Sequence, residues 1–289
     1  MCKHAEDKFL WVSLVLDELL RISPSEPDQE IPRVPGTLNL MYERIINQID
    51  SEHADVVREI LLWVVTAVRP LTTNELAAVT APGRKVGDFS PSKGEALRET
   101  LANIDLCWPL VQVREKTQTV HLIHQTAGDY LVATNLVPPL PQANFAISLT
   151  CSQHLSAQLG EELKAGNSAS SNREALLEYG CAHWPWHARL SGDKVLTDTA
   201  WEEDWFLQDP EKRRALYSLY GPHTLGSTKL PQTATLLHAV AFLGLTHILI
   251  AIGNQESLDL DTSTRDELGR TPLHWAAEMG RGDTVKYFS

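Results

Sequence analysis

The chain has 289 residues, of which 43% are hydrophobic and 21% are charged, and this is the composition of a folded protein. Its length accommodates two domains of about 100 to 200 residues each. A formal net charge of −12 argues against nucleic acid and anionic membranes as partners, because both attract basic protein faces. The cysteines lack the paired spacing of a disulfide framework or zinc ribbon, which predicts a reducing, cytoplasmic location; they are Cys2, Cys107, Cys151 and Cys181.

An apolar run from Phe9 to Leu16 is the first predicted element. It predicts no membrane span, because a span needs about 20 apolar residues and Asp17 and Glu18 interrupt this run. A shared helical face predicts an ordinary amphipathic or buried helix; its members are Phe9, Val12, Leu16 and Leu19. Prolines then predict an extended linker; they are Pro24, Pro27, Pro32 and Pro35.

Residues 36–137 carry the element order of a winged helix, in which helices are followed by a β-hairpin. Apolar residues recur with helical spacing over 38–49 and again over 56–68, so two helices are predicted there. Thr72 and Glu75 have the spacing of a capping box, which predicts the start of another helix. Two alternating apolar runs predict the strands of the hairpin; they are residues 110–113 and 120–123.

A second capping pattern, at Ser92 and Glu95, predicts the helix that would read DNA in a DNA-binding winged helix. On this helix Lys93 and Arg98 are balanced by Glu95 and Glu99, so the surface has no net positive charge to meet phosphates. The pattern therefore favours a protein-packing role over nucleic-acid binding.

Residues 138–230 predict a helical bridge, which a proline cluster over 138–141 separates from the winged helix. Helices are predicted over 143–160 and 173–190 and near 199–207. Aromatic residues gather in the last part of the bridge; they are Trp201, Trp205, Phe206, Tyr217 and Tyr220. They indicate core packing, with a partner-binding patch as the alternative.

The stretch from Asp266 to Gly280 is the most informative part of the chain, because each position fits one turn-plus-helix unit. Its order T-P-L-H-x-A is the signature of an ankyrin repeat; the matching residues are Thr271, Pro272, Leu273, His274 and Ala276. Thr271 is expected to cap the helix, and Gly280 to take the left-handed geometry that ends it. Ala276 and Ala277 leave room for a second helix to pack closely.

A weaker copy of this pattern lies upstream, offset by 271 − 235 = 36 residues, compared with about 33 for an ankyrin repeat. The residues in register are Thr235, His238, Ala241 and Gly244. Residues 231–289 are therefore expected to form two ankyrin repeats, the second of them truncated. Because such units bury their apolar faces only against neighbours, we expect an exposed, apolar C-terminal edge.

Six further segments carry a family resemblance; they are Phe9–Leu20, Met41–Ile45, Ile60–Trp63, Arg69–Leu76, Val120–Leu131 and Tyr179–His187. Together with the repeats they resemble fungal NACHT-ankyrin proteins, which are NLR-like signal-transduction ATPases of the STAND class. The resemblance runs from about Lys8 to Ser289. It implies that the first segment closes a nucleotide-binding module, that the winged helix moves relative to this module, and that the repeats bind a ligand protein.

The nucleotide-binding core of that family has no counterpart in the sequence. A phosphate-binding loop needs the string G-x-x-x-x-G-K-[ST], and no such string occurs. Residues 1–35 are therefore expected to be the terminal helix of a missing module plus a linker. Met1 is expected to mark a truncated product, a split gene or a misplaced gene start. No ATP hydrolysis and no cofactor are predicted, and a nucleotide-binding module in the same polypeptide or in trans is an expected partner.

The sequence patterns for hydrolysis, metal binding and acid–base catalysis are weak. The winged-helix segment is also similar to that of GPI inositol deacylases, but residues 166–170 lack the closing glycine of a hydrolase G-x-S-x-G turn. His183 and His187 have a spacing that could serve a metal, yet no further ligand has a fixed relation to them. His124 and Asp129 could act as base and orienting acid, but no nucleophile is tied to them. We predict no catalytic, cofactor-binding or metal-binding residues.

The sequence thus predicts a mainly α-helical, non-catalytic protein-interaction and signal-relay fragment of an NLR-like switch protein. The alternatives are an inert truncated remnant and, less favoured, a winged-helix nucleic-acid binder or a deacylase-like hydrolase. The expected partner surface comprises Arg265, Glu267 and Arg270. The expected structural positions of the repeats are Asp266, Gly269, Thr271, Pro272, Leu273, His274, Ala277, Gly280, His238, Ala241 and Gly244.

Overall fold

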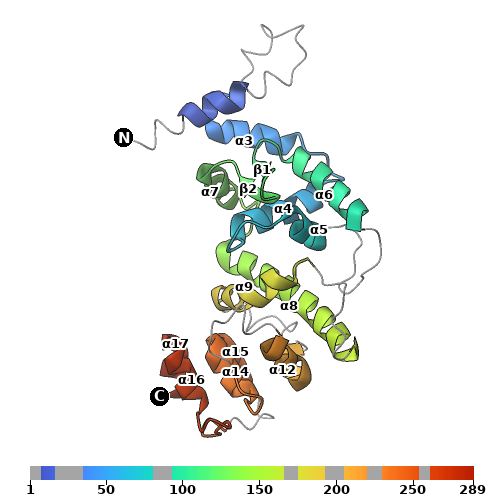
Figure 1. Cartoon of the computed structure of the whole chain (residues 1–289). Helices are drawn as coiled ribbons and strands as arrows, with labels where there is room; N and C mark the ends of the chain where they lie inside the picture. The colour runs from blue at the N-terminus through green and yellow to red at the C-terminus, as the bar shows by residue number, and fades with distance from the viewer. Residues whose placement is uncertain are drawn as a thin grey trace.

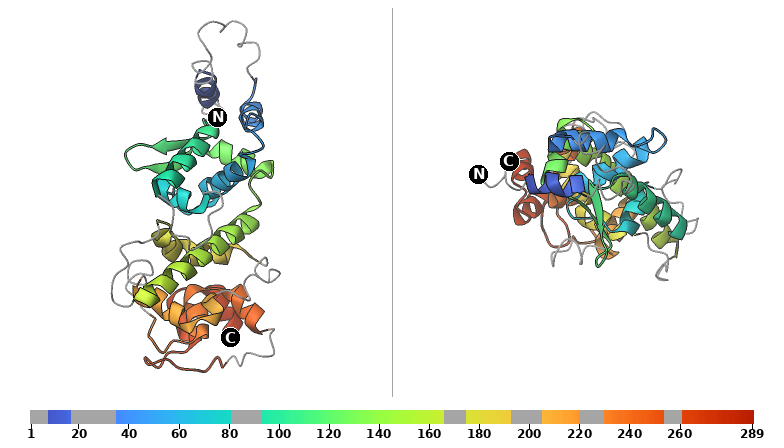
Figure 2. Two further views of the ribbon diagram at one scale, coloured as in Figure 1. Left: turned by 90° about the vertical axis from the view of Figure 1, so that its right-hand side faces the viewer. Right: turned by 90° about the horizontal axis from the view of Figure 1, so that it is seen from above.

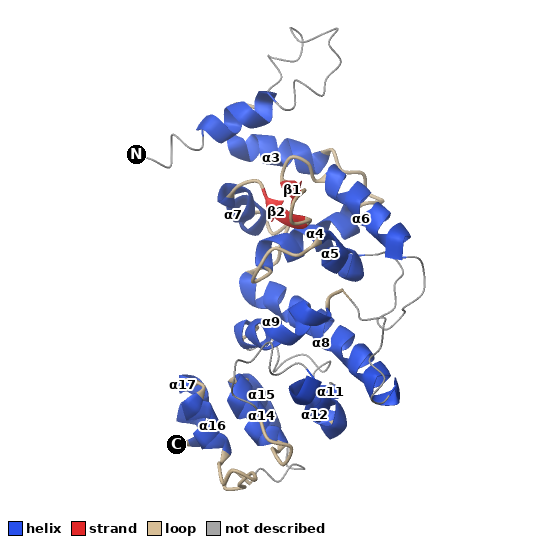
Figure 3. Cartoon of the chain, in the orientation of Figure 1, coloured by secondary structure: helices blue, strands red, loops and turns tan. Residues whose placement is uncertain are grey.

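The computed structural model describes residues 8–16, 35–80, 93–165, 175–192, 205–219, 230–253 and 261–289. Within these ranges the protein is mainly α-helical, and its one sheet has two strands (Figure 3). The molecule is elongated, with the helices around the hairpin at one end, two long helices in the middle and short paired helices at the other end (Figures 1 and 2). The predicted fold class is confirmed.

Residues 8–16 form a helix that lies along α3 (Leu38–Asn47) at one end of the molecule (Figure 1). Leu14 is fully buried, and the indole Nε1 of Trp11 donates a hydrogen bond to the carbonyl oxygen of Pro35, 2.8 Å away. The apolar face that predicted this helix is instead exposed; its described members are Phe9, Val12 and Leu16, and Leu19 lies outside the described residues. Both faces are apolar, so periodicity alone did not show which one packs inward.

The winged-helix segment comprises α3, α4 (Ala54–Thr66), α5 (Thr73–Thr80), α6 (Lys93–Leu106), β1 (Val111–Arg114), β2 (Thr119–Leu122) and α7 (Gln125–Ala133). The two strands are antiparallel, with Val111 opposite Leu122. An isolated bridge between Thr72 and Thr119 places the start of α5 against the hairpin. The central helix α4 buries Trp63 completely, as expected for the element that the others surround.

The capping box that predicted α5 is present. The backbone N–H of Thr72 donates to the Glu75 carboxylate at 2.7 Å, and the backbone N–H of Glu75 donates to Oγ1 of Thr72 at 3.2 Å. Leu71 and Leu76 are both buried, as a hydrophobic staple requires. The second predicted capping residue, Ser92, lies outside the described residues.

The bridge comprises α8 (Leu140–Ala165), α9 (Leu177–Leu190), α11 (Trp205–Gln208) and α12 (Pro210–Leu219). Helix α8 begins inside the proline cluster, with Pro141 in its first turn, where a missing N–H costs little. The helix expected near residues 199–207 is described only from Trp205, and it ends before Pro210 starts a separate helix that the sequence analysis did not predict.

Residues 235–253 and 271–288 form two helical hairpins, called the first unit and the second unit below. The first contains α14 (Leu236–Leu243) and α15 (Thr246–Gly253), and the second contains α16 (Pro272–Glu278) and α17 (Gly282–Phe288). Helix α14 packs against α16 and α15 against α17 (Figure 1). None of the helices within the described ranges has both the length and the hydropathy needed to cross a lipid bilayer.

Candidate protein-interaction site and the joints that position it

The second unit begins with a histidine-based capping box. Thr271 is the N-cap of α16, and its backbone N–H donates to Nδ1 of His274 at 3.3 Å, while its hydroxyl lies 2.7 Å from the same nitrogen. Because Nδ1 accepts the amide hydrogen, the ring proton of the neutral imidazole is on Nε2. Pro272 occupies the first turn, and Gly280 has a φ of +64° just past the helix end.

The first unit has the same capping box and shows what the second ring nitrogen does. The backbone N–H of Thr235 donates to Nδ1 of His238 at 3.1 Å, and Nε2 of His238 donates to the carbonyl oxygen of Arg270 at 3.0 Å. His238 is fully buried. The bond therefore ties the first unit to the loop that leads into the second.

The loop over residues 265–270, called the finger loop below, is built around one carboxylate. Oδ1 of Asp266 accepts hydrogen bonds from the backbone N–H groups of Leu268 and Arg270, each at 2.9 Å, and Oδ2 accepts one from Nε1 of Trp275 at 2.7 Å. Burial raises the pKa of Asp266, but these hydrogen bonds outweigh it and hold the pKa below its ordinary value. The loop is thus fixed by a charged acceptor.

Three side chains of the finger loop face solvent; they are Arg265, Glu267 and Leu268, the last of them 58% exposed. Arg270 is less accessible, because its guanidinium lies 4.6 Å from the ring centroid of Trp275 and is paired with the Glu278 carboxylate at 2.5 Å. Of the three predicted partner residues, Arg265 and Glu267 are therefore exposed and Arg270 is held against the unit. Leu268 was not among the predicted partner residues.

Equivalent positions in the two units differ in burial. Ala241 is completely buried, whereas Ala277 is exposed, and His238 is buried, whereas His274 is exposed. In the first unit, α14 packs against α16, and His238 is hydrogen-bonded to the finger loop that leads into the second unit. The described residues contain no further hairpin that covers the second unit.

The edge of the second unit is less apolar than expected. Phe288 is partly buried against the core, and the buried Thr284 has its hydroxyl 2.7 Å from that of Thr246. Tyr287 is 40% exposed, yet its hydroxyl donates to the carbonyl oxygen of Leu249 at 3.1 Å. Helix α17 turns these groups toward the first unit, so its exposed edge is less apolar than expected, although Tyr287 remains partly exposed on it.

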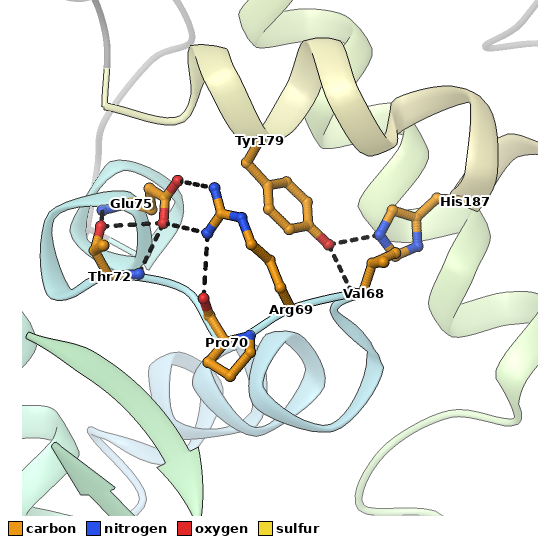
Figure 4. A network of polar contacts seen from close by, with 7 residues as sticks. All are labelled: Val68, Arg69, Pro70, Thr72, Glu75, Tyr179 and His187. Atoms are coloured by element: carbon orange, nitrogen blue, oxygen red, sulfur yellow. Dashed lines mark hydrogen bonds and ion pairs between the residues drawn. The ribbon is translucent and has the colours of Figure 1, made fainter. Parts of the chain in front are cut away.

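A buried polar network, called the winged-helix joint below, connects the winged-helix segment to the bridge (Figure 4). The backbone N–H of Val68, just after α4, donates to the hydroxyl of Tyr179 at 3.0 Å, and this hydroxyl lies 2.7 Å from Nε2 of His187. Nδ1 of His187 lies 2.7 Å from Oδ1 of Asn144 in α8. Because an amide oxygen only accepts, Nδ1 carries the ring proton and Nε2 accepts from Tyr179.

The electrostatics of the joint match this assignment. Burial, with a smaller contribution from His183, lowers the pKa of His187 to about 4, so the ring is neutral at neutral pH. Burial also raises the pKa of Tyr179, so its hydroxyl keeps the proton that it donates. The joint therefore holds three elements together without a buried charge.

Helix α9 contacts both ends of the molecule. The Arg69 guanidinium, 5.1 Å from the Tyr179 ring centroid, pairs with the Glu75 carboxylate at 2.6 Å (Figure 4). Burial raises the pKa of Glu75, but hydrogen bonds from Arg69 and the α5 cap outweigh it and lower the pKa. Near the other end of α9, Nη1 of Arg189 donates to the carbonyl oxygen of Leu243 in the first unit at 2.6 Å. One helix thus links the winged-helix segment to the repeats.

The positions weighed for catalysis and metal binding have structural partners. Nδ1 of His124 accepts the backbone N–H of Thr126 at 3.3 Å at the start of α7, and Asp129 accepts from the side chain of Gln125 at 3.2 Å. Among the residues that the structure describes, no group of three or more His, Cys, Asp or Glu side chains could hold a metal ion. Residues 166–170 lie outside the described ranges.

Sequence reasoning missed the winged-helix joint. It considered His187 for a metal and Tyr179 only as part of a bridge helix. The one available signal was a histidine inside an aromatic helix, which needs polar partners when it is buried. Those partners lie far away in the chain, with a sequence separation of 43 positions for Asn144 and His187 and of 111 for Val68 and Tyr179.

Two family descriptions match parts of the chain. The GPI inositol-deacylase winged helix domain matches residues 43–148, from within α3 to the first part of α8, and the ankyrin repeat matches residues 268–288, which contain the second unit. The chain is thus similar to a winged helix domain over the first range and to an ankyrin repeat over the second. Neither match spans half of the chain.

A curated relative extends this comparison. The chain is 31% identical over 134 residues to the vegetative incompatibility protein HET-E-1 of Podospora anserina. The match covers 45% of this chain and 9% of that protein, so the chain corresponds to a small part of the relative. These matches fit the winged-helix, ankyrin and fungal components of the resemblance. No solved structure matches the chain.

Proposed function

We propose that this chain is a non-catalytic, protein-binding and signal-relay part of a fungal NLR-like protein, and that the finger loop contacts the partner. The observation that carries the proposal is the exposed Leu268 on a backbone held by Asp266. A preorganised loop loses little conformational entropy on binding, and an exposed leucine supplies apolar contact area. The ankyrin match over residues 268–288 and the fungal relative support the same role.

The relay part of the proposal depends on α9. Tyr179 holds Val68 of the winged-helix segment, and Arg189 holds Leu243 of the first unit. A partner that displaces the repeats would therefore act on the winged-helix segment through one helix with fixed contacts at both ends. Such a transmission requires two arrangements of α9 with different affinities for the partner.

The helix over residues 8–16 offers a second contact surface. Phe9, Val12 and Leu16 are 79%, 45% and 54% exposed. We propose that a nucleotide-binding module, in the same polypeptide or in trans, covers this apolar face, because apolar groups gathered on one surface mark interaction sites. A cytoplasmic location is part of the same proposal and is supported by the buried, free Cys107, whose thiol pKa burial raises to about 12.

The charges on α6 support a protein partner rather than a nucleic acid. Its sequence contains Lys93 and Arg98 against Glu95, Glu99 and Asp105, and the three carboxylate residues are exposed. Phosphates are repelled by such a surface.

The proposal is tested by purifying bound proteins from extracts of the producing cells with matched baits. Leu268→Asp changes the finger loop, and Leu163→Asp changes a leucine that is 43% exposed on α8, far along the chain from the loop. We expect the wild type and L163D to retain the same specific proteins and L268D to lose them by about tenfold or more, which corresponds to about 1.4 kcal/mol. Equal retention by all three baits, or equal loss with both variants, contradicts the proposal.

A further inference from the structure

Two arginines from different parts of the fold converge on the end of α14. Nη1 of Arg189, on α9, donates to the carbonyl oxygen of Leu243 at 2.6 Å, and Nε of Arg281, just before α17, donates to that of Phe242 at 3.2 Å. Phe242 and Leu243 are consecutive residues at the C-terminal end of α14. Both guanidinium groups therefore lie at this end of α14, where the bridge, the first unit and the second unit come together.

Neighbouring groups fix both guanidinium groups. That of Arg189 lies 5.6 Å from the ring centroid of Trp186. The aliphatic part of the Arg281 side chain packs against Gly244. A Cβ added at Gly244 would lie 2.6 Å from Cδ of Arg281. Gly244 has a φ of +72°, so both the backbone and this close approach require glycine. Each arginine uses one N–H on a helix carbonyl and has further donors in its planar group.

No carboxylate neutralises this pair among the described residues, whose ion pairs involve other arginines and lysines. Burial lowers the pKa of Arg189 to about 10, and the charge of Arg281 adds to the effect. Burial lowers the pKa of Arg281 as well. Two like charges that are partly removed from water destabilise each other, and the partial negative charge at the end of α14 offsets this only in part.

We propose that Arg189 and Arg281 form an oxyanion-binding site, which takes a phosphate or carboxylate group between their guanidinium groups. The planar fork of N–H donors matches both kinds of oxyanion with paired hydrogen bonds. The bound group connects the bridge to the second unit across the C-terminal end of α14. The finger loop is held near the other end of α14, through His238, so this site is separate from the proposed partner surface.

Titration of the whole chain with inorganic phosphate and, separately, with acetate tests the site. Thermal unfolding is followed at constant ionic strength, with chloride as the replaced anion. A saturable rise in Tm of a few degrees is expected, because a ligand that binds only the folded state stabilises it. A response to phosphate alone identifies a phosphate site, and a response to acetate alone identifies a carboxylate site. A wild-type chain with no saturable response to either anion overturns the proposal, whether or not any variant folds.

Conservative variants distinguish the site from general anion effects. Arg189→Lys and Arg281→Lys keep the charge and lose the planar fork, so each is expected to weaken binding by about tenfold. Arg214→Lys is the control, because Arg214 is exposed on α12 and its Nε donates to the carbonyl oxygen of Pro210. It should bind as the wild type does. Equal responses in all three variants, or equal loss in all three, overturn the assignment.

Discussion

The first and second units share one capping arrangement and differ in what covers it. His238 and His274 both accept a threonine N–H at Nδ1, yet His238 is buried and holds the carbonyl oxygen of Arg270, whereas His274 is exposed. Ala241 and Ala277 differ in the same way. Because the local pattern is the same in both units, the neighbour and not the residue type determines how much each position contributes to stability.

The largest expected effect comes from the ring shared by the two units. Trp275 is 1% exposed, lies 5.7 Å from Phe242 between ring centroids, and donates to Asp266. Trp275→Ala should lower the free energy of unfolding by about 3–5 kcal/mol, measured by chemical denaturation. Tyr287→Ala removes an aromatic that is 40% exposed and should cost about 1 kcal/mol. If both variants lost the same free energy of unfolding, contact between the two units would not determine how much a residue contributes to stability.

A smaller effect is the pH dependence of stability caused by the buried His187 of the winged-helix joint. The folded-state pKa of His187 is about 4, compared with 6.5 for the unperturbed group. As the pH falls below 6.5, the unfolded chain binds a proton that the folded chain does not, so stability is lost progressively down to about pH 4. The loss amounts to about 3 kcal/mol. Above pH 6.5 His187 is neutral in both the folded and the unfolded chain, so this group makes its full contribution to stability and the free energy of unfolding does not change with pH on its account. Urea denaturation across this pH range measures it.

Two variants test whether His187 causes this change of the free energy of unfolding with pH. His187→Gln should flatten it, whereas Arg214→Lys, which changes no histidine, should leave it as in the wild type. His183, whose pKa burial also lowers, keeps its own contribution in both variants. An unchanged slope in H187Q would mean that the winged-helix joint does not depend on a neutral His187.

The smallest expected difference is between the two capping histidines. His238→Ala leaves the carbonyl oxygen of Arg270 without its donor and should lower the free energy of unfolding by about 1–3 kcal/mol. His274→Ala removes an exposed cap and should cost about 1 kcal/mol or less. Native-state hydrogen exchange should also show faster exchange of the finger loop in H238A only. The comparison between the units fails if both variants behave alike.

The local features of the fold were predictable because their signals lie within a few residues of each other. The Thr72 and Glu75 pair predicted the start of α5, and alternation around a polar turn predicted the hairpin. The register of Thr235 with Thr271 predicted two similar hairpins. In each case the backbone hydrogen-bonding groups find partners among residues close in the sequence, so a short sequence pattern is enough to predict the element.

Features that depend on distant segments were not predictable. Spacing alone did not show which side of the helix over residues 8–16 packs inward, because both sides are apolar. The winged-helix joint connects Val68, Tyr179 and Asn144, which no spacing rule relates. Leu268 lies inside a recognisable repeat, but its exposure follows from how Asp266 folds the finger loop.

The sequence by itself determined the helical units, their caps and the order of winged helix, bridge and repeats, because these follow from periodicity and from short hydrogen-bonded patterns. Only the tertiary structure decided which faces are covered, which histidine is held neutral between three elements, and where Arg189 and Arg281 meet. Burial and charge pairing are properties of neighbours in space, and chain separation does not encode them.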